Sequence, residues 1–243
     1  MPLEQSEAFI LRTFNIGEQD KIVTFFSSDK GVIKGIANGA RKFGNRFGSS
    51  LEPLSHVKVY YYEKEQKDLV TISNCDLLES FFEIQKDLKT TFALSYFIEL
   101  IEGFSPTRSK DSVLFRLLLS TLNALKGGGN LDLLSVYFET WFLKIGGVLP
   151  DFKKCKKCRA PITASAWLGP KRDGIICKKC VLQKKEEIKI EMIPLLQWIK
   201  KNPPPTDHTL PCSPQELKDT REILQQIVVY HLEKEPKNLK YLK

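Results

Sequence analysis

The sequence has no long apolar run and no segment typical of export. No stretch approaches about 18 uninterrupted apolar residues, the length that indicates a membrane-spanning helix. Arg116 interrupts the first strongly apolar stretch, and the second is interrupted by Asp132, Glu139 and Lys144. The first residues, Met1 to Glu7, contain neither a basic segment nor an apolar one. A signal peptide needs both, so the sequence predicts a cytoplasmic protein with no membrane association.

Histidine is scarce as well, which limits the chemistry available to the chain. The three histidines lie far apart and none stands beside a plausible nucleophile, so triad catalysis has no support. A zinc deaminase needs His-x-Glu upstream of Pro-Cys-x-x-Cys. Here His231-Leu232-Glu233 follows both cysteine pairs, and Ile176 rather than proline precedes Cys177. The glycine-rich segments 35–42 and 127–130 also lack the P-loop pattern. The sequence therefore predicts a protein that is not an enzyme.

The positive charge of the chain is concentrated in one segment. Residues 151–190 carry 12 lysines and arginines against four acidic residues, whereas residues 1–80 carry 10 against 11. This segment accounts for the formal net charge of +8. A localised positive field attracts a polyanion, so the distribution favours nucleic acid as the partner.

The chain is expected to have an α+β multidomain fold that begins with a barrel. Five short runs rich in β-branched and aromatic residues are separated by turn-forming residues. These runs are 7–14, 21–26, 32–37, 56–63 and 69–73. Five strands in about 75 residues predict a small barrel such as the OB-fold. An SH3-like barrel has a similar strand count and stays open as an alternative.

The rest of the chain has helical periodicity around a cysteine-rich insertion. Apolar faces predict helices near 88–102, 114–125 and 131–145, with a break at 127–130. Ser213-Pro214-Gln215-Glu216 has the capping-box pattern that begins a helix. We therefore expect an OB-fold at 1–80, a helical bundle domain at 81–150 that continues at 191–243, and a separate cysteine module at 151–190.

The cysteine module has the spacing of a zinc ribbon. Two Cys-x-x-Cys pairs, separated by 18 residues, are formed by Cys155, Cys158, Cys177 and Cys180. Two such turns facing each other supply four thiolates, which is the ligand set of a tetrahedral Zn²⁺ ion. Four sulfur ligands leave no open coordination position, so one structural zinc ion is predicted. Two disulfides, or four reduced thiols, are the alternatives. Cys75 and Cys212 lack a paired spacing and are expected to pack as small apolar residues.

A basic loop in the barrel is the candidate nucleic-acid contact. Cations, two aromatic rings and glycines are interleaved between Lys30 and Leu51, over the third predicted strand and the loop that follows it. The predicted contacts are Lys34, Arg41, Lys42, Phe43, Arg46 and Phe47. Cations follow a phosphate backbone and aromatic rings stack on bases, without base-specific readout. The alternative is that the phenylalanines close the barrel core. Likewise, the lysines of the cysteine module either contact phosphate or only balance the thiolates.

The barrel and the cysteine module together resemble the RecO family of bacterial recombination mediators. The matching segments are Glu18-Gln19-Asp20-Lys21-Ile22-Val23-Thr24-Phe25-Phe26, Gly31 through Ile36-Ala37-Asn38-Gly39-Ala40-Arg41-Lys42, Leu51-Glu52-Pro53, and Phe138-Glu139 to Gly146-Gly147-Val148-Leu149-Pro150 followed by Cys155-x-x-Cys158. Two departures are Asn45, where a serine is expected, and the ending Leu239-Lys240-Tyr241. Family members also differ in whether they keep the cysteines.

The resemblance implies an N-terminal OB-fold and a helical domain that carries a zinc element. It also implies binding of single- and double-stranded DNA, annealing of complementary strands, and cooperation with RecR. The family engages the C-terminal tail of single-stranded DNA-binding protein and helps load the RecA recombinase in the RecF pathway. DNA contact is carried over to Lys34, Arg41, Lys42 and Arg46. The competing hypotheses are an RNA-binding zinc-ribbon protein of translation or transcription and a scaffold for an acidic protein.

Overall fold

The computed structural model describes residues 2–63, 68–105, 109–184, 187–207 and 211–242. The chain divides into two compact units, Met1–Arg116 and Leu117–Lys243. The predicted domain boundary at residue 80 lies inside the first unit, because Phe81, a following helix and Phe115 pack against the barrel. Within the described part of the chain, no helix combines the length and the apolar character that a membrane crossing requires.

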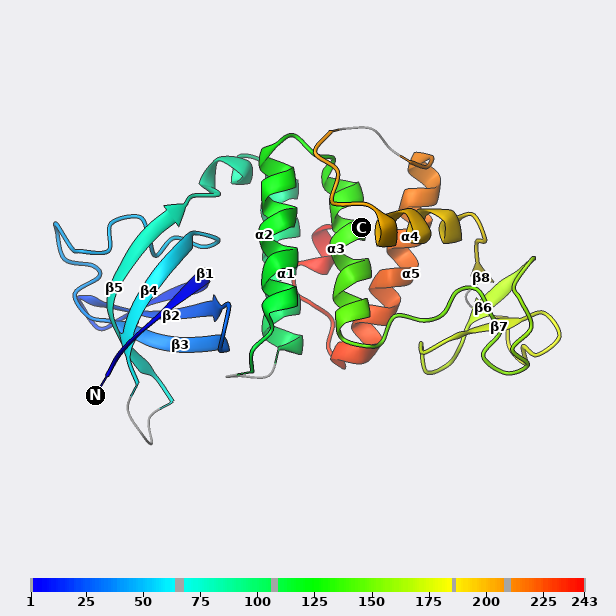
Figure 1. The fold of residues 1–243 in the computed structure, drawn as a ribbon, viewed down its shortest axis with the longest axis horizontal. Helices are drawn as coiled ribbons and strands as arrows, with labels where there is room; N and C mark the ends of the chain where they lie inside the picture. Colours follow the sequence, from blue (N-terminus) through cyan, green and yellow to red (C-terminus); the bar gives the residue numbers. More distant parts are fainter. Residues whose placement is uncertain (1, 64–67, 106–108, 185–186, 208–210, 243) are drawn as a thin grey trace. The chain divides into compact units, whose positions relative to one another are not determined.

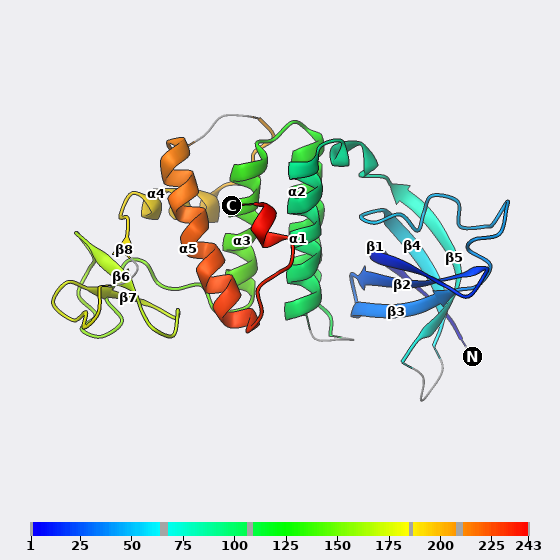
Figure 2. The same ribbon diagram turned by 180° about the vertical axis from the view of Figure 1, so that it is seen from behind.

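The first unit contains the five-stranded barrel that the strand pattern predicts (Figures 1 and 2). Its strands are β1 (Leu3–Ile16), β2 (Asp20–Ser27), β3 (Gly31–Ala37), β4 (His56–Tyr62) and β5 (Val70–Glu79). They close in the order β1-β2-β3-β5-β4, with a parallel pair β3–β5 and antiparallel pairs elsewhere. This arrangement is consistent with the OB-fold.

Alternation along the strands separates a barrel interior from an outer face. In β2, Val23 and Phe25 are fully buried in the barrel core, and Ile33 of β3 joins them. The residues between them point outward. A bulge in β1 between Ile10 and Arg12 shifts the register, so that Ile10 faces inward and Arg12 faces outward.

Helical residues cover one end of this outer face. Phe9 of β1 contacts Phe81 and Phe115, at ring-centroid distances of 6.3 and 5.0 Å, and Phe26 of β2 lies 5.8 Å from Phe115. The 3-10 helix η1 (Phe82–Gln85) leads into α1 (Leu88–Phe104), whose N-terminus is capped by Asp87. Arg12 donates to Glu102 of α1 at 2.7 Å, and this ion pair borders the covered part of the face.

The second unit is mainly helical, as predicted. Its helices are the C-terminal part of α2 (Ser112–Lys126), α3 (Leu131–Ile145), α4 (Met192–Lys201), α5 (Pro214–Leu232) and the 3-10 helix η2 (Leu239–Tyr241). Gly128 has φ +96° and ends α2 at the predicted break. The capping box at Ser213 is confirmed: its hydroxyl accepts from the Glu216 backbone N–H, and the Glu216 carboxylate accepts from the Ser213 N–H.

Polar contacts join α3 to α5 inside this unit. Arg221 of α5 is largely buried and donates to Asp132 at 3.0 Å, and Gln225 donates to the fully buried Glu139 at 3.4 Å. Trp141 of α3 donates to the Ile199 carbonyl of α4 at 3.3 Å. These helices form a packed scaffold from which the cysteine module extends.

Candidate metal and nucleic-acid sites

The cysteine module is built on a three-stranded sheet and two tight turns. Its strands are β6 (Ala166–Leu168), β7 (Ile175–Cys177) and β8 (Glu187–Ile188), in the order β7-β6-β8. In the first turn, the Arg159 N–H donates to the Cys155 carbonyl at 2.9 Å, and Arg159 has a left-handed φ of +61°. In the second turn, the Cys180 N–H donates to the Cys177 carbonyl at 2.9 Å. Each turn brings its two thiols to the same side of the backbone.

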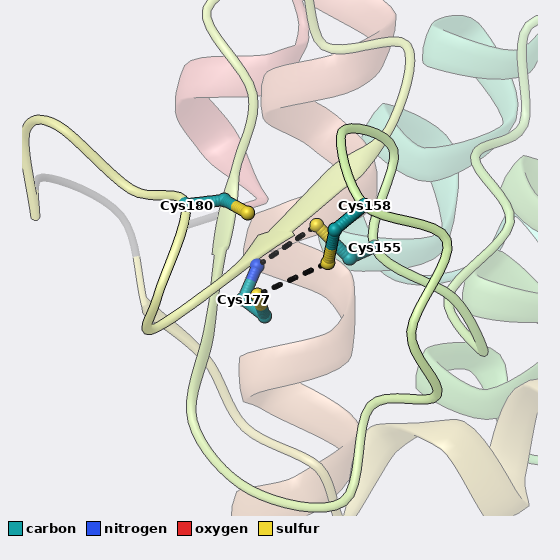
Figure 3. Close-up of side chains that lie close together, drawn as sticks. All are labelled: Cys155, Cys158, Cys177 and Cys180. Carbon is teal, nitrogen blue, oxygen red and sulfur yellow. Dashed lines mark hydrogen bonds between the residues drawn. The ribbon is translucent and has the colours of Figure 1, made fainter.

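The four sulfurs converge on one point (Figure 3). The Sγ atoms of Cys155, Cys158, Cys177 and Cys180 all lie within 4.8 Å of one another. The Cys158 and Cys177 sulfurs are 3.7 Å apart. A tetrahedron with metal–sulfur bonds of about 2.3 Å has sulfur–sulfur edges of about 3.8 Å. The four predicted ligands are therefore close enough to hold a metal ion, and their spacing fits a tetrahedral centre.

The environment of the sulfurs favours thiolate at one position and thiol at another. Burial opposes ionisation of Cys155, but backbone N–H groups directed at its sulfur, including that of Cys177 at 3.4 Å, lower its pKa to about 6. Hydrogen bonding to the neighbouring sulfurs of Cys158 and Cys177 raises the pKa of Cys180 to about 12. A metal ion that binds all four sulfurs would therefore displace protons.

The lysines around the sulfurs differ in their contacts. Lys156 forms an ion pair with Asp173, and Lys157 donates to the Cys180 carbonyl at 3.3 Å. Lys154, Lys178 and Lys179 are exposed. The module therefore combines positive charge that is engaged within the fold with positive charge that faces solvent.

The two remaining cysteines are separate from this cluster. Cys75 is buried in the barrel core, where burial raises its pKa to about 11. Cys212 is half-buried, and burial raises its pKa as well. Both environments suppress thiolate, which supports the expectation that these residues pack as apolar groups.

The predicted basic loop lies between β3 and β4 and is anchored to the barrel at both ends. Ala40, Phe47, Leu51 and Leu54 of the loop are buried. The Leu54 N–H donates to the Ile10 carbonyl at 2.7 Å. The loop therefore presents its polar residues from a backbone that is held in place.

The four predicted cations are exposed. Lys34 points outward from β3, and Arg41, Lys42 and Arg46 lie on the loop. Arg46 donates from Nε to the Ser73 carbonyl at 2.6 Å, and its guanidinium lies 4.6 Å from the Phe47 ring centre. Lys30 belongs to the same basic run but forms ion pairs with Glu4 and Glu63 instead. Although burial opposes the charge on Lys30, these hydrogen bonds raise its pKa.

The two phenylalanines of the loop have different environments. Phe43 is fully exposed, as a base-stacking ring must be. Phe47 is only 3% exposed and belongs to the barrel core. The prediction that Phe47 contacts nucleic acid therefore needs correction: burial of its ring anchors the loop, which is the structural alternative considered for these residues.

Sequence reasoning missed an exposed aromatic ring on β1. The sequence pattern places Phe14 at the end of the first predicted strand and indicates no role in binding, yet the side chain is 57% exposed. Strand alternation was the signal available in the sequence: Phe14 is two residues from Arg12 and from Ile16, so these three side chains share one face of the strand. The bulge at Ile10/Arg12 conceals this signal by changing which residues face outward.

Comparison with known proteins finds one family over both the barrel and the part of the chain that contains the cysteine cluster. The family model described as "Recombination protein O N terminal" matches residues 1–81, and "Recombination protein O C terminal" matches residues 85–240. The chain is 35% identical over 232 residues to the "DNA repair protein RecO" of Koribacter versatilis, covering 96% of this chain and 95% of the relative. It is 30% identical over 240 residues to the protein of the same name from Dehalococcoides mccartyi strain 195, covering 98% and 94%.

A barrel, a helical unit and full-length similarity to repair proteins define this chain as a DNA repair and recombination protein. It belongs to the RecO family. This membership confirms the resemblance seen in the barrel and around the first cysteine pair. It also favours a role in DNA repair over the alternative role in RNA binding.

Proposed function

We propose that the chain is a recombination mediator that binds single- and double-stranded DNA and anneals complementary strands. The observation that carries this proposal is the anchored loop with exposed Arg41, Lys42 and Arg46 and the exposed ring of Phe43. Cations neutralise phosphates, and the ring offers a stacking surface for a base. The loop is therefore suited to hold a strand without reading its sequence.

Annealing follows from the electrostatics of two strands on one protein. Complementary strands repel each other through their phosphates, and basic surfaces that neutralise phosphates lower this repulsion. The barrel loop is one such surface, and the exposed lysines Lys154, Lys178 and Lys179 supply a second. Annealing by this mechanism needs no nucleotide hydrolysis, so the prediction that the chain is not an enzyme is retained here.

One structural Zn²⁺ ion is proposed for the cysteine cluster. Cys155, Cys158, Cys177 and Cys180 would hold it as thiolates, and their number leaves no position for a substrate. The ion would fix the two turns relative to each other and thereby position the lysines beside them. Its role would be to stabilise the module, since such sites contribute directly to folding.

The proposed partners follow from family membership. They are RecR and the C-terminal tail of single-stranded DNA-binding protein, with which the chain would help load recombinase onto coated DNA in the cytoplasm. An acidic, hydrophobic tail needs an apolar groove with a basic rim, and the helical unit is the place to search for it. Titration of a labelled tail peptide against the chain, with a charge-scrambled peptide as control, tests this partner.

An annealing assay tests the proposed function. Complementary oligonucleotides coated with single-stranded DNA-binding protein are mixed with the chain, and duplex formation is followed by fluorescence transfer. We expect the chain to accelerate annealing without a nucleotide, and a zinc chelator to reduce the acceleration. An annealing rate equal to that without the chain would contradict the mediator proposal.

A further inference from the structure

The outer face of β1, β2 and β3 continues past the part covered by helical residues. Phe14 of β1 is paired with Ile22 of β2, and Ile22 is paired with Ile36 of β3. Directly opposed residues of neighbouring strands share a face, so these three side chains form a row across the sheet. Val23 and Phe25 belong to the opposite face and fill the core. We call Phe14, Ile16, Ile22 and Ile36 the open strip.

The open strip differs in exposure from the covered part of the same face. Phe9 and Phe26 are fully buried beneath aromatic rings, and the Arg12–Glu102 ion pair borders that cover. Beyond Arg12, Phe14 is 57% exposed and Ile16 is 42% exposed. Phe14 and Ile16 adjoin Ile22 and Ile36 on one face of the sheet, so they form a contiguous apolar patch and not an isolated exposed ring, and a contiguous patch is typical of a binding surface.

Hydrogen bonds hold the basic loop against the β1–β2 turn, beside this strip. The Arg41 N–H donates to the Gln19 carbonyl, and its guanidinium donates to the Gly17 carbonyl, both at 2.9 Å. These acceptors lie in the turn between β1 and β2. The Gly39 N–H also donates to the Asp20 carboxylate, at 2.7 Å. Figure 2 shows the loop between β3 and β4 at the same end of the barrel as this turn.

Lys34 completes the arrangement. It is paired with Thr24 of β2, which is paired with Arg12 of β1, so it occupies the outward row next to Phe14, Ile22 and Ile36. The open strip, in which Phe14 and Ile16 are exposed and Ile22 and Ile36 are half-buried, therefore has exposed cations at two borders: Lys34 along the sheet and Arg41 at the turn. This combination of one aromatic ring, apolar side chains and positive charge is complementary to an unpaired nucleic-acid strand, whose bases stack and whose phosphates are negatively charged.

We propose that the open strip is a stacking surface for single-stranded DNA, on which Phe14 stacks against an unpaired base while Lys34 and Arg41 contact the flanking phosphates. The inference rests on the proposed function and deepens it. In a duplex the bases are paired and stacked internally, so the strip engages only single strands. Phe14 thus gives the chain a preference for single strands that cations by themselves do not provide.

Affinity measurements on Phe14→Ala test the proposal. Loss of one stacked base is expected to weaken binding of an oligothymidylate by about tenfold, with duplex affinity unchanged. Phe82→Ala is the matched control, because Phe82 is also exposed, at 70%, but lies in η1 outside the strip. Thermal unfolding of both variants checks that the barrel remains folded.

A second variant, Phe14→Trp, gives a spectroscopic readout. It retains a stacking ring, so affinity for the oligothymidylate should stay within about twofold of the original protein. The three native tryptophans, Trp141, Trp167 and Trp198, belong to the other unit. Emission from the new indole should be quenched by the oligothymidylate and unaffected by a duplex.

The outcomes separate this proposal from the proposed function. If Phe14→Ala binds both DNA forms as tightly as the original chain, the stacking proposal is wrong, and a protein segment becomes the better occupant of the strip. Equal weakening of single-strand and duplex binding would also overturn it. If the original chain binds neither form at low salt, the proposed function itself fails.

Discussion

Removing the loop cations should change the salt dependence of DNA binding by a calculable amount. Each phosphate contact adds about 0.7 to the slope of log affinity against log salt for a single strand. The triple variant Arg41→Ala, Lys42→Ala, Arg46→Ala should therefore reduce the slope by about 2.1. When salt is raised from 50 to 200 mM, the loss of affinity should therefore be about 18-fold smaller for the triple variant than for the original chain, whatever contacts are made elsewhere.

Fluorescence anisotropy of a labelled single strand, recorded over a series of salt concentrations, measures this slope. The matched control is Lys218→Ala, Lys234→Ala, Lys237→Ala, which removes the same charge from exposed positions in the second unit. General electrostatic attraction would lower both slopes equally, whereas direct contact lowers only that of the loop variant. An unchanged slope in a folded loop variant would refute the assignment of these cations.

Three further predictions address the anchoring ring, the metal and the helix cap. Phe47→Ala should lower the free energy of unfolding by about 3–5 kcal/mol, as for other buried rings. Phe43→Ala should change it by no more than about 0.5 kcal/mol, because that ring is exposed. Chemical denaturation measures both values, and equal values would contradict the prediction. Cys158→Ser should reduce bound zinc from one ion to a small fraction by metal analysis. In the unaltered chain, protons compete with zinc for the sulfurs, so zinc affinity should fall as the pH decreases. The fall should already be present above the pKa of Cys155, about 6, because the Cys180 thiol has a raised pKa and must lose its proton on binding; a pH-independent affinity would exclude thiolate ligation. Ser213→Ala should lower stability by about 1 kcal/mol in thermal unfolding, with Ser213→Asp close to neutral.

Local patterns predicted the elements of this fold well. Five runs of β-branched and aromatic residues became the five strands, and the pattern Ser213-Pro214-Gln215-Glu216 became the observed capping box. The two Cys-x-x-Cys pairs also came together, because each tight turn fixes its own pair and the hairpin of β6 and β7 adjoins the second one. These features depend on short-range geometry that the sequence encodes directly.

Features that depend on long-range packing were not predictable in the same way. A glycine-rich loop has no periodicity, so nothing local distinguishes buried Phe47 from exposed Phe43. Lys30, in the turn before β3, forms ion pairs with Glu4 and Glu63, which are 26 and 33 residues away in the sequence, so no local pattern indicates these contacts. Helix α4 was not identified as a separate element, since it is 10 residues long and contains Pro194, which is tolerated only because it lies in the first turn.

Photo-crosslinking tests the central claim that DNA lies on the barrel most directly. A single strand carrying 5-bromodeoxyuridine is irradiated with the chain, and the linked peptides are identified by mass spectrometry. We predict links to the peptides that contain Phe14 and Phe43, with yields that fall as salt rises. Links confined to residues 117–243 would contradict the claim and transfer DNA binding to the helical unit.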